Sequence, residues 1–247
     1  MTTPVNSRIL VSACFIAALA LPAAGCDIDP ASILSDVNQP QVDIDATADD
    51  SGNTHIQVCV TTSLSPSCGR QQGGGDTASA NFTGGAGASL EFKLEFQGMS
   101  GFEAGSYIGD LKGNGADELT VSFNSFASKV NLPKPMVFAS PMEGSSHSLA
   151  SGDIQLKWDK LGESDVKMEW SHQGKCASSD WNEVGGTLDD TGSFSIPKSA
   201  FPSIPAEGCE LSIIVNRSRT GTMHEKLAED GSILGTQSRK ITLTLTP

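Results

Sequence analysis

The clearest structural signal in the chain is the stretch LEFKLEFQ, residues 90–97. Leu90, Phe92, Leu94 and Phe96 would lie on one face of a strand, because successive side chains of a strand point to opposite faces. The Glu, Lys, Glu and Gln side chains between them would face water. One buried face and one wet face are typical of antiparallel sheets in sandwiches and barrels.

The same period of two recurs along the rest of the chain. It is found in apolar triplets that alternate with mostly polar residues, namely Ile56–Val58–Val60, Leu119–Val121–Phe123, Ile154–Leu156–Trp158, Val166–Met168–Trp170, Leu211–Ile213–Val215 and Ile241–Leu243–Leu245. Glycine-rich and Asp/Asn/Ser-rich turns separate these runs, as expected between strands. The sequence therefore predicts an all-β protein.

Two prolines mark the best internal boundary. Pro133 and Pro135 suit an extended connector and would interrupt a sheet ladder. We predict one antiparallel β-sandwich domain over residues 42–133 and a second over residues 134–247, each of the size of one sandwich. Residues 26–41 show no period and are interpreted as a flexible tether.

An export signal precedes this tether. Residues 9–21 form a 13-residue apolar run, which is too short to span about 30 Å of hydrocarbon and has the length of a signal-peptide core. Small residues then precede Cys26, an arrangement that resembles the bacterial lipoprotein signal, or lipobox, although Ala23 stands where that family usually has Leu. The resemblance implies removal of residues 1–25 and acylation of Cys26, as by palmitate. The alternative is an ordinary secretory signal that is cut nearby.

The charge of the chain limits its partners. With 16 Lys and Arg against 29 Asp and Glu, the formal net charge is -13, so nucleic-acid binding is not expected. An anionic membrane surface would repel such a body, and the lipid on Cys26 would have to hold it there. The anchor places the protein in the cell envelope, on the inner or outer membrane, facing the periplasm or the cell surface.

The cysteines indicate an oxidising compartment. Of the six, Cys14 lies in the signal and Cys26 would carry the lipid. The remaining four cysteines allow three pairings, of which we predict Cys59–Cys68 and Cys176–Cys209, because each bond then lies within one proposed domain. A zinc site is the alternative, but it usually requires cysteines two to four residues apart, and this spacing offers none.

Two resemblances bear on the fold and the family. The stretch PMVFASPMEGSSHSLASGDIQLKW, residues 135–158, resembles the start of fibronectin type III and immunoglobulin-like modules, which would place Trp158 in the core. The whole layout resembles envelope lipoproteins of gliding and predatory deltaproteobacteria, a group for which no activity is implied. The features that carry it are the lipobox, NLPKPMVFASP, Gly-Lys-Cys at 174–176, EGCELSIIVNRSRTGT and the ending GSILGTQSRKITLTLTP.

One loop is a candidate metal site. GDLKGNGADEL, residues 109–119, resembles the calcium loop of integrin-type FG-GAP repeats, with Asp110, Asn114 and Glu118 at three oxygen-ligand positions. Lys112 departs from that pattern, because it puts a cation where a ligand should be. The alternative is a β-hairpin with Gly-Asn-Gly at its tip, and no cofactor is expected otherwise.

The remaining candidate residues are few. The four histidines lie in no catalytic signature, and His147 and His172 are expected in loops or hairpins. Four basic residues near the C-terminus would be salt-bridged or solvated, or would form a patch for an anionic envelope polymer: Arg217, Arg219, Arg239 and Lys240.

These observations predict a non-enzymatic, membrane-anchored envelope lipoprotein with a structural or binding role. An envelope glycan or protein is the expected partner. A glycan-binding or adhesive module is the first alternative and would need exposed aromatics, for which Tyr107, Trp170 and Trp181 are candidates. A secreted hydrolase is the second, and would need acidic or histidine side chains that converge from distant loops.

Overall fold

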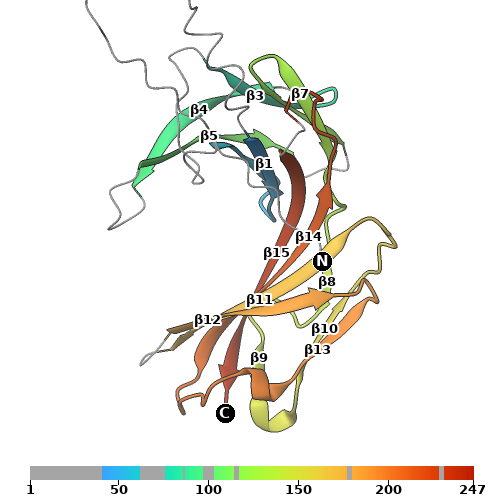
Figure 1. The fold of residues 1–247 in the computed structure, drawn as a ribbon. Helices are drawn as coiled ribbons and strands as arrows, with labels where there is room; N and C mark the ends of the chain where they lie inside the picture. Colours follow the sequence, from blue (N-terminus) through green and yellow to red (C-terminus); the bar gives the residue numbers. More distant parts are fainter. Residues whose placement is uncertain are drawn as a thin grey trace, which may run out of the picture. The chain divides into compact units, whose positions relative to one another are not determined.

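The computed structural model describes residues 41–61, 76–85, 87–96, 103–113, 117–176, 180–227 and 231–247. These residues form fifteen strands and two short 3-10 turns, Leu149–Ser151 and Lys198–Ala200 (Figure 1). The prediction of an all-β fold is confirmed.

The strands of the first part of the chain follow one another along a single sheet path. They are β1 (Gln41–Ala48), β2 (Asn53–Thr61), β3 (Ala78–Phe82), β4 (Gly87–Phe96), β5 (Glu103–Lys112), β6 (Glu118–Phe123) and β7 (Phe126–Asn131). Their order is β1-β2-β5-β4-β3-β6-β7. Residues 87–90 of β4 pair with β3, and residues 91–96 pair with β5. This strand therefore links the group β1-β2-β5 to the group β3-β6-β7.

The strands of the second part form two separate groups. They are β8 (Phe138–Ser140), β9 (Ser146–Ser148), β10 (Ile154–Trp158), β11 (Lys167–Cys176), β12 (Asp180–Leu188), β13 (Ser193–Ile196), β14 (Cys209–Thr220) and β15 (Ser232–Thr246). One group is a three-stranded sheet of order β13-β10-β8. The other has the order β12-β11-β14-β15 and continues through β15 into β1 (Figure 1).

Two pairings depart from the predicted antiparallel arrangement. β1 runs parallel to β15, from Asp43 beside Ser232 to Ala48 beside Gln237, and β9 also runs parallel to β15. Parallel neighbours need a long connection, and here most of the chain lies between β1 and β15. The alternation of side chains reports which face of a strand is buried, but not the direction of its neighbour.

The buried apolar side chains form two cores. One contains Ile44, Ile56 and Leu119 among others. The other contains Leu156 and Ile213 among others. The strand β15 joins them, because it supplies residues to both: Ile233 to the first core and Ile241, Leu243 and Leu245 to the second.

The proline connector lies between these cores. Leu132 is buried in the first core, and Met136 is buried in the second. Trp158 is 5% exposed and shares the inward face of β10 with Ile154 and Leu156, as predicted.

Candidate functional site

Several predicted site residues lie outside the described part of the chain. These are the signal and its Cys26, the tether up to residue 40, Cys68 and Asn114. The described strands and turns include no helix with the length and hydrophobicity needed to cross a membrane.

The predicted disulfide between Cys176 and Cys209 is confirmed. The two residues are direct cross-strand partners on β11 and β14, with Cα atoms 4.5 Å apart. The bond therefore joins neighbouring strands of one sheet and closes the end of this strand pair. Cys59, on β2, is also disulfide-bonded, and its predicted partner Cys68 is outside the described residues.

The two described residues of the candidate calcium loop have other partners. Asp110 Oδ1 accepts a hydrogen bond from His55 Nδ1 at 2.9 Å, and Glu118 forms an ion pair with Lys129 Nζ at 2.7 Å. Nowhere in the described ranges do three His, Cys, Asp or Glu side chains gather as metal ligands.

The alternative of a β-hairpin at this loop is wrong. β5 pairs with β2 and β4, whereas β6 pairs with β3 and β7. The loop therefore connects two strands that pair with different neighbours and not with each other.

His172 lies on the β11 strand of the β11–β12 hairpin, in line with the hairpin expectation, and its side chain is buried in the core. It lies in the middle of β11 with 1% of its surface exposed. Its ring stacks on Trp170 at a centroid distance of 5.4 Å and contacts Phe201 at 5.0 Å. Because Trp170 and His172 are two residues apart on one strand, they point to the same inward face.

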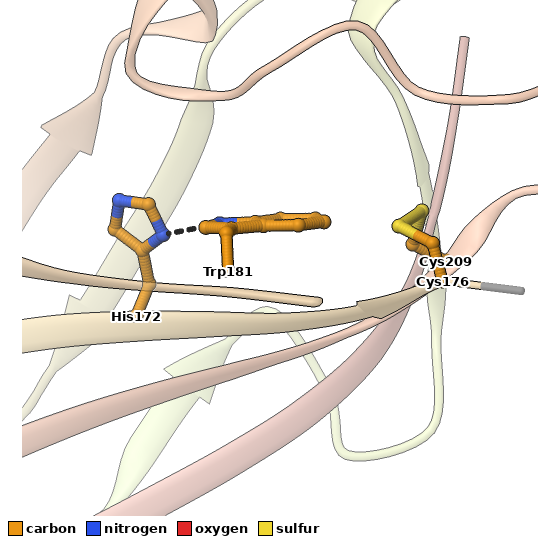
Figure 2. Close-up of a disulfide and its surroundings, with 4 residues drawn as sticks. All are labelled: His172, Cys176, Trp181 and Cys209. Carbon is orange, nitrogen blue, oxygen red and sulfur yellow. Dashed lines mark hydrogen bonds between the residues drawn. A yellow bond between two sulfur atoms is a disulfide. The ribbon is translucent and has the colours of Figure 1, made fainter. Parts of the chain in front are cut away.

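The imidazole of His172 is held by a tryptophan from the next strand (Figure 2). Trp181 Nε1 donates a hydrogen bond to His172 Nδ1 at 3.2 Å, and Glu183 Oε2 lies 3.9 Å from His172 Nε2. Burial lowers the pKa of His172 below its ordinary value of 6.5, and the nearby Glu183 carboxylate opposes this only in part. The neutral ring, with Nδ1 as an acceptor, is therefore the form that fits this site.

Gly174 makes room for the indole ring. A Cβ atom at this position would meet the Trp181 ring at 1.9 Å. His172, Trp181 and the disulfide lie on the same side of β11, with the indole between the other two groups (Figure 2). A tryptophan on an edge strand is thus packed against the sheet instead of projecting into solvent.

Two of the three candidate platform aromatics are buried, so that expectation is wrong for them. Tyr107 is 5% exposed and makes edge contacts with Phe92 and Phe123. Trp170 is 7% exposed and packs on His172. Tyr107 packs in the first core and Trp170 in the second.

A group of ion pairs lies beside the proline connector. Arg217 continues the inward positions of β14 and is 1% exposed. Its Nη2 lies 3.0 Å from Glu163 Oε2 and 3.6 Å from Asp190 Oδ2, and its Nη1 donates to the Lys134 carbonyl oxygen at 2.7 Å. This buried cation therefore has two carboxylates and one carbonyl as partners.

Arg219 extends the same group of charges. It forms ion pairs with Glu163 at 3.0 Å and Asp165 at 2.7 Å, and its Nη1 donates to the Asn131 carbonyl oxygen at 3.3 Å. The hydrogen bond from Arg219 holds the pKa of Asp165 below its usual value. We name this group the junction cluster; its members are Arg217, Arg219, Glu163, Asp165 and Asp190.

The junction cluster also secures a core residue. Asp190 accepts a hydrogen bond from Trp158 Nε1 at 2.9 Å and further bonds from the backbone N–H groups of Leu161 and Gly162. Burial would raise the pKa of Asp190, but these hydrogen bonds outweigh it and the pKa is lowered. Arg239 pairs with Asp50, so all three arginines near the C-terminus are salt-bridged, as predicted.

The fourth basic residue of that group, Lys240, belongs to a different feature. An open hollow of about 370 Å³ lies over the outward side of β12, β11, β14 and β15. Gly174 and Trp181 line part of it, and its other lining residues are polar: Lys175, Asp180, Glu210 and Lys240 are charged, and Gln173, Asn182 and Ser212 are neutral. We name these seven residues and the space between them the outer hollow.

The side chains of the outer hollow are not engaged with one another. None of the seven makes a side-chain hydrogen bond or an ion pair with another residue of the described ranges. Even Ser212, which is 4% exposed, has no partner for its hydroxyl there. Donors and acceptors that converge on a hollow and are free of internal partners can bind a ligand.

The pattern along single strands does not reveal this hollow. Its residues come from four strands, and the register alone brings them together: Gln173 lies beside both Asn182 and Ser212, and Lys175 lies beside both Asp180 and Glu210. A signal did exist in the polar residues that alternate with the apolar ones on these strands. Polar residues alternate in this way on every strand face that is exposed to solvent, so the pattern does not identify a binding site.

Comparison with known proteins does not show a family. No family model and no curated protein matches the chain. Among solved structures, one described as a cytokine receptor complex aligns with 81% of this chain and 95% of its own, at 10% identity and a TM-score of 0.24.

Proposed function

We propose that the protein is a non-enzymatic envelope lipoprotein whose β body is a binding module held at a membrane by Cys26. The observation that carries the binding role is the outer hollow, where seven polar side chains lack internal partners. The lipobox resemblance supports the anchor, and the Cys176–Cys209 disulfide is consistent with an exported protein.

The histidines support a role without catalysis. Each of the four is engaged within the described residues: His55 with Asp110, His147 with the Gly152 carbonyl oxygen, His172 with Trp181, and His224 with the backbone N–H of Lys226. A general base needs a free ring nitrogen that faces a substrate. None of the four histidines lines the outer hollow, where a bound substrate would have to lie.

The body is proposed to consist of antiparallel β-sandwiches, the second one immunoglobulin-like. The strand groups β8-β10-β13 and β12-β11-β14-β15 support this proposal, because fibronectin type III and immunoglobulin-like modules divide their strands in a similar way. The junction cluster binds the connector carbonyls of Asn131 and Lys134, which would hold the two cores in one body.

The anchor is tested by fractionating cells that express Cys26→Ala. We expect the variant to leave the membrane fraction without detergent, because no acyl chain remains to hold an acidic protein there. Cys14→Ala is the matched control, since it removes a thiol that the lipobox does not use. A Cys26→Ala protein that still needs detergent for extraction would refute the anchor and leave the binding role untouched.

A further inference from the structure

We propose that the outer hollow binds a neutral glycan segment rich in hydroxyl and amide groups. The inference deepens the proposed binding role and is independent of the lipid anchor. It rests on the charges, the hydrogen-bonding groups and the size of the hollow.

The charges of the hollow balance. Lys175 and Lys240 contribute two positive charges, and Asp180 and Glu210 contribute two negative ones. No ion pair within 4.0 Å joins these four side chains in the described structure, unlike those of the junction cluster. A site with no net charge gives no advantage to a polyanion or a polycation, whose binding depends on a surplus of the opposite sign.

The neutral residues of the hollow both donate and accept hydrogen bonds. Gln173 and Asn182 each present an amide oxygen and an amide NH₂ group, and Ser212 presents a hydroxyl. Sugar hydroxyls have the same dual character, and an N-acetyl group adds an amide that pairs with Gln and Asn. The lysines add donors and the carboxylates add acceptors, so a polyhydroxylated ligand could pair with every side chain of the set.

The size and openness of the hollow fit a polymer segment. Its volume of about 370 Å³ lies at the lower end of the range of about 300–1,000 Å³ found for small-ligand sites. Because the hollow is open, a chain bound by one segment could continue beyond it on either side. Glycans of the cell envelope have this form.

A protein partner fits the hollow less well. Cores of protein interfaces are enriched in apolar and aromatic side chains and depleted in charged ones. Val137, Met142 and Val184 are large apolar side chains exposed on the surface, and none of them lines the hollow. Trp181 is the one aromatic residue of its lining, and most of the other lining residues have charged or amide side chains.

The proposal is tested by titrating the full-length chain in detergent with tetra-N-acetylchitotetraose and following binding by calorimetry. We expect saturable binding, and a loss of about tenfold or more in affinity in the double variant Asn182→Ala/Lys240→Ala, because each removed hydrogen bond contributes to affinity. Lys157→Ala is the matched control: it removes an exposed strand lysine from β10, in the other sheet, and should leave affinity unchanged.

Three results would overturn the proposal. The first is no binding at millimolar oligosaccharide. The second is equal affinity of the double variant and the parent for the oligosaccharide. The third is tighter binding of a peptide than of the oligosaccharide at the hollow. Thermal melting of each variant checks that it is folded. If Cys26→Ala is released from membranes but the oligosaccharide does not bind, the anchor stands and the glycan site fails.

Discussion

The two faces of the sheet formed by β12, β11, β14 and β15 treat polar residues in opposite ways. On the inward face, Arg217 has two carboxylate partners and a carbonyl, and His172 receives a hydrogen bond from Trp181. On the outward face, the side chains of Lys175 and Lys240 have no partner within the described residues. The same strands thus carry inward polar residues that have partners, although Arg217 Nε and Gln237 Oε1 lack a hydrogen bond, and outward polar side chains that have none among the described residues.

The difference follows from where water is. A polar group that leaves water without a hydrogen bond costs free energy, so most inward polar groups are paired. Outward groups stay hydrated and lose little when unpaired, and surface ion pairs add little when formed. The inward set therefore stabilises the fold, and the outward set is available for a ligand.

The largest expected effect comes from removing the buried cation of the junction cluster. Arg217→Ala would leave Glu163 and Asp190 near each other without their shared partner. Breaking a buried ion pair in this way typically costs about 3–5 kcal/mol. Urea denaturation followed by circular dichroism measures the loss, and a loss below about 1 kcal/mol would show that the cluster is not a stabilising element.

A smaller effect is expected from the inward histidine, and it depends on pH. Burial lowers the pKa of folded His172 below 6.5, so the unfolded chain binds the proton more readily. Its contribution to stability is full above about pH 6.5 and falls as the pH drops below that value, by at most about 1.4 kcal/mol per pH unit.

The variant His172→Gln tests this assignment. Glutamine keeps an acceptor for Trp181 and does not titrate, so the difference in stability between pH 7 and pH 5 should shrink relative to the parent. The pKa values of the Asp165 and Asp190 carboxylates are lowered from 3.8, so these groups titrate below pH 5. They therefore do not contribute to the stability difference between pH 7 and pH 5. Parallel pH profiles for the two proteins would contradict a buried neutral imidazole.

The smallest effect on stability is expected on the outward face. Lys175→Ala and Lys240→Ala each remove an exposed charge that has no partner among the described residues, so unfolding free energies should change by no more than about 0.5 kcal/mol. Denaturation under the conditions used for Arg217→Ala makes the comparison direct. A loss of 2 kcal/mol in either variant would mean that the outer hollow is structural.

Local patterns were enough to predict the strands. The alternation of Ile154, Leu156 and Trp158 has a period of two, and a strand with one buried face follows from it wherever the strand lies. The Cys176–Cys209 disulfide was predictable from the number of cysteines and the limits of one domain. The salt bridges of Arg217 and Arg219 were predictable from the excess of acidic residues.

The partners of those strands could not be predicted in this way. The pairing of β1 with β15, the separation of β5 from β6 and the placement of His172 in the core depend on contacts between residues far apart in the sequence. Periodicity within one segment contains no information about which segment will lie beside it. Composition and spacing therefore determined the class of fold and the chemistry available, whereas strand register decided which polar side chains were paired inside and which met, unpaired, in the outer hollow.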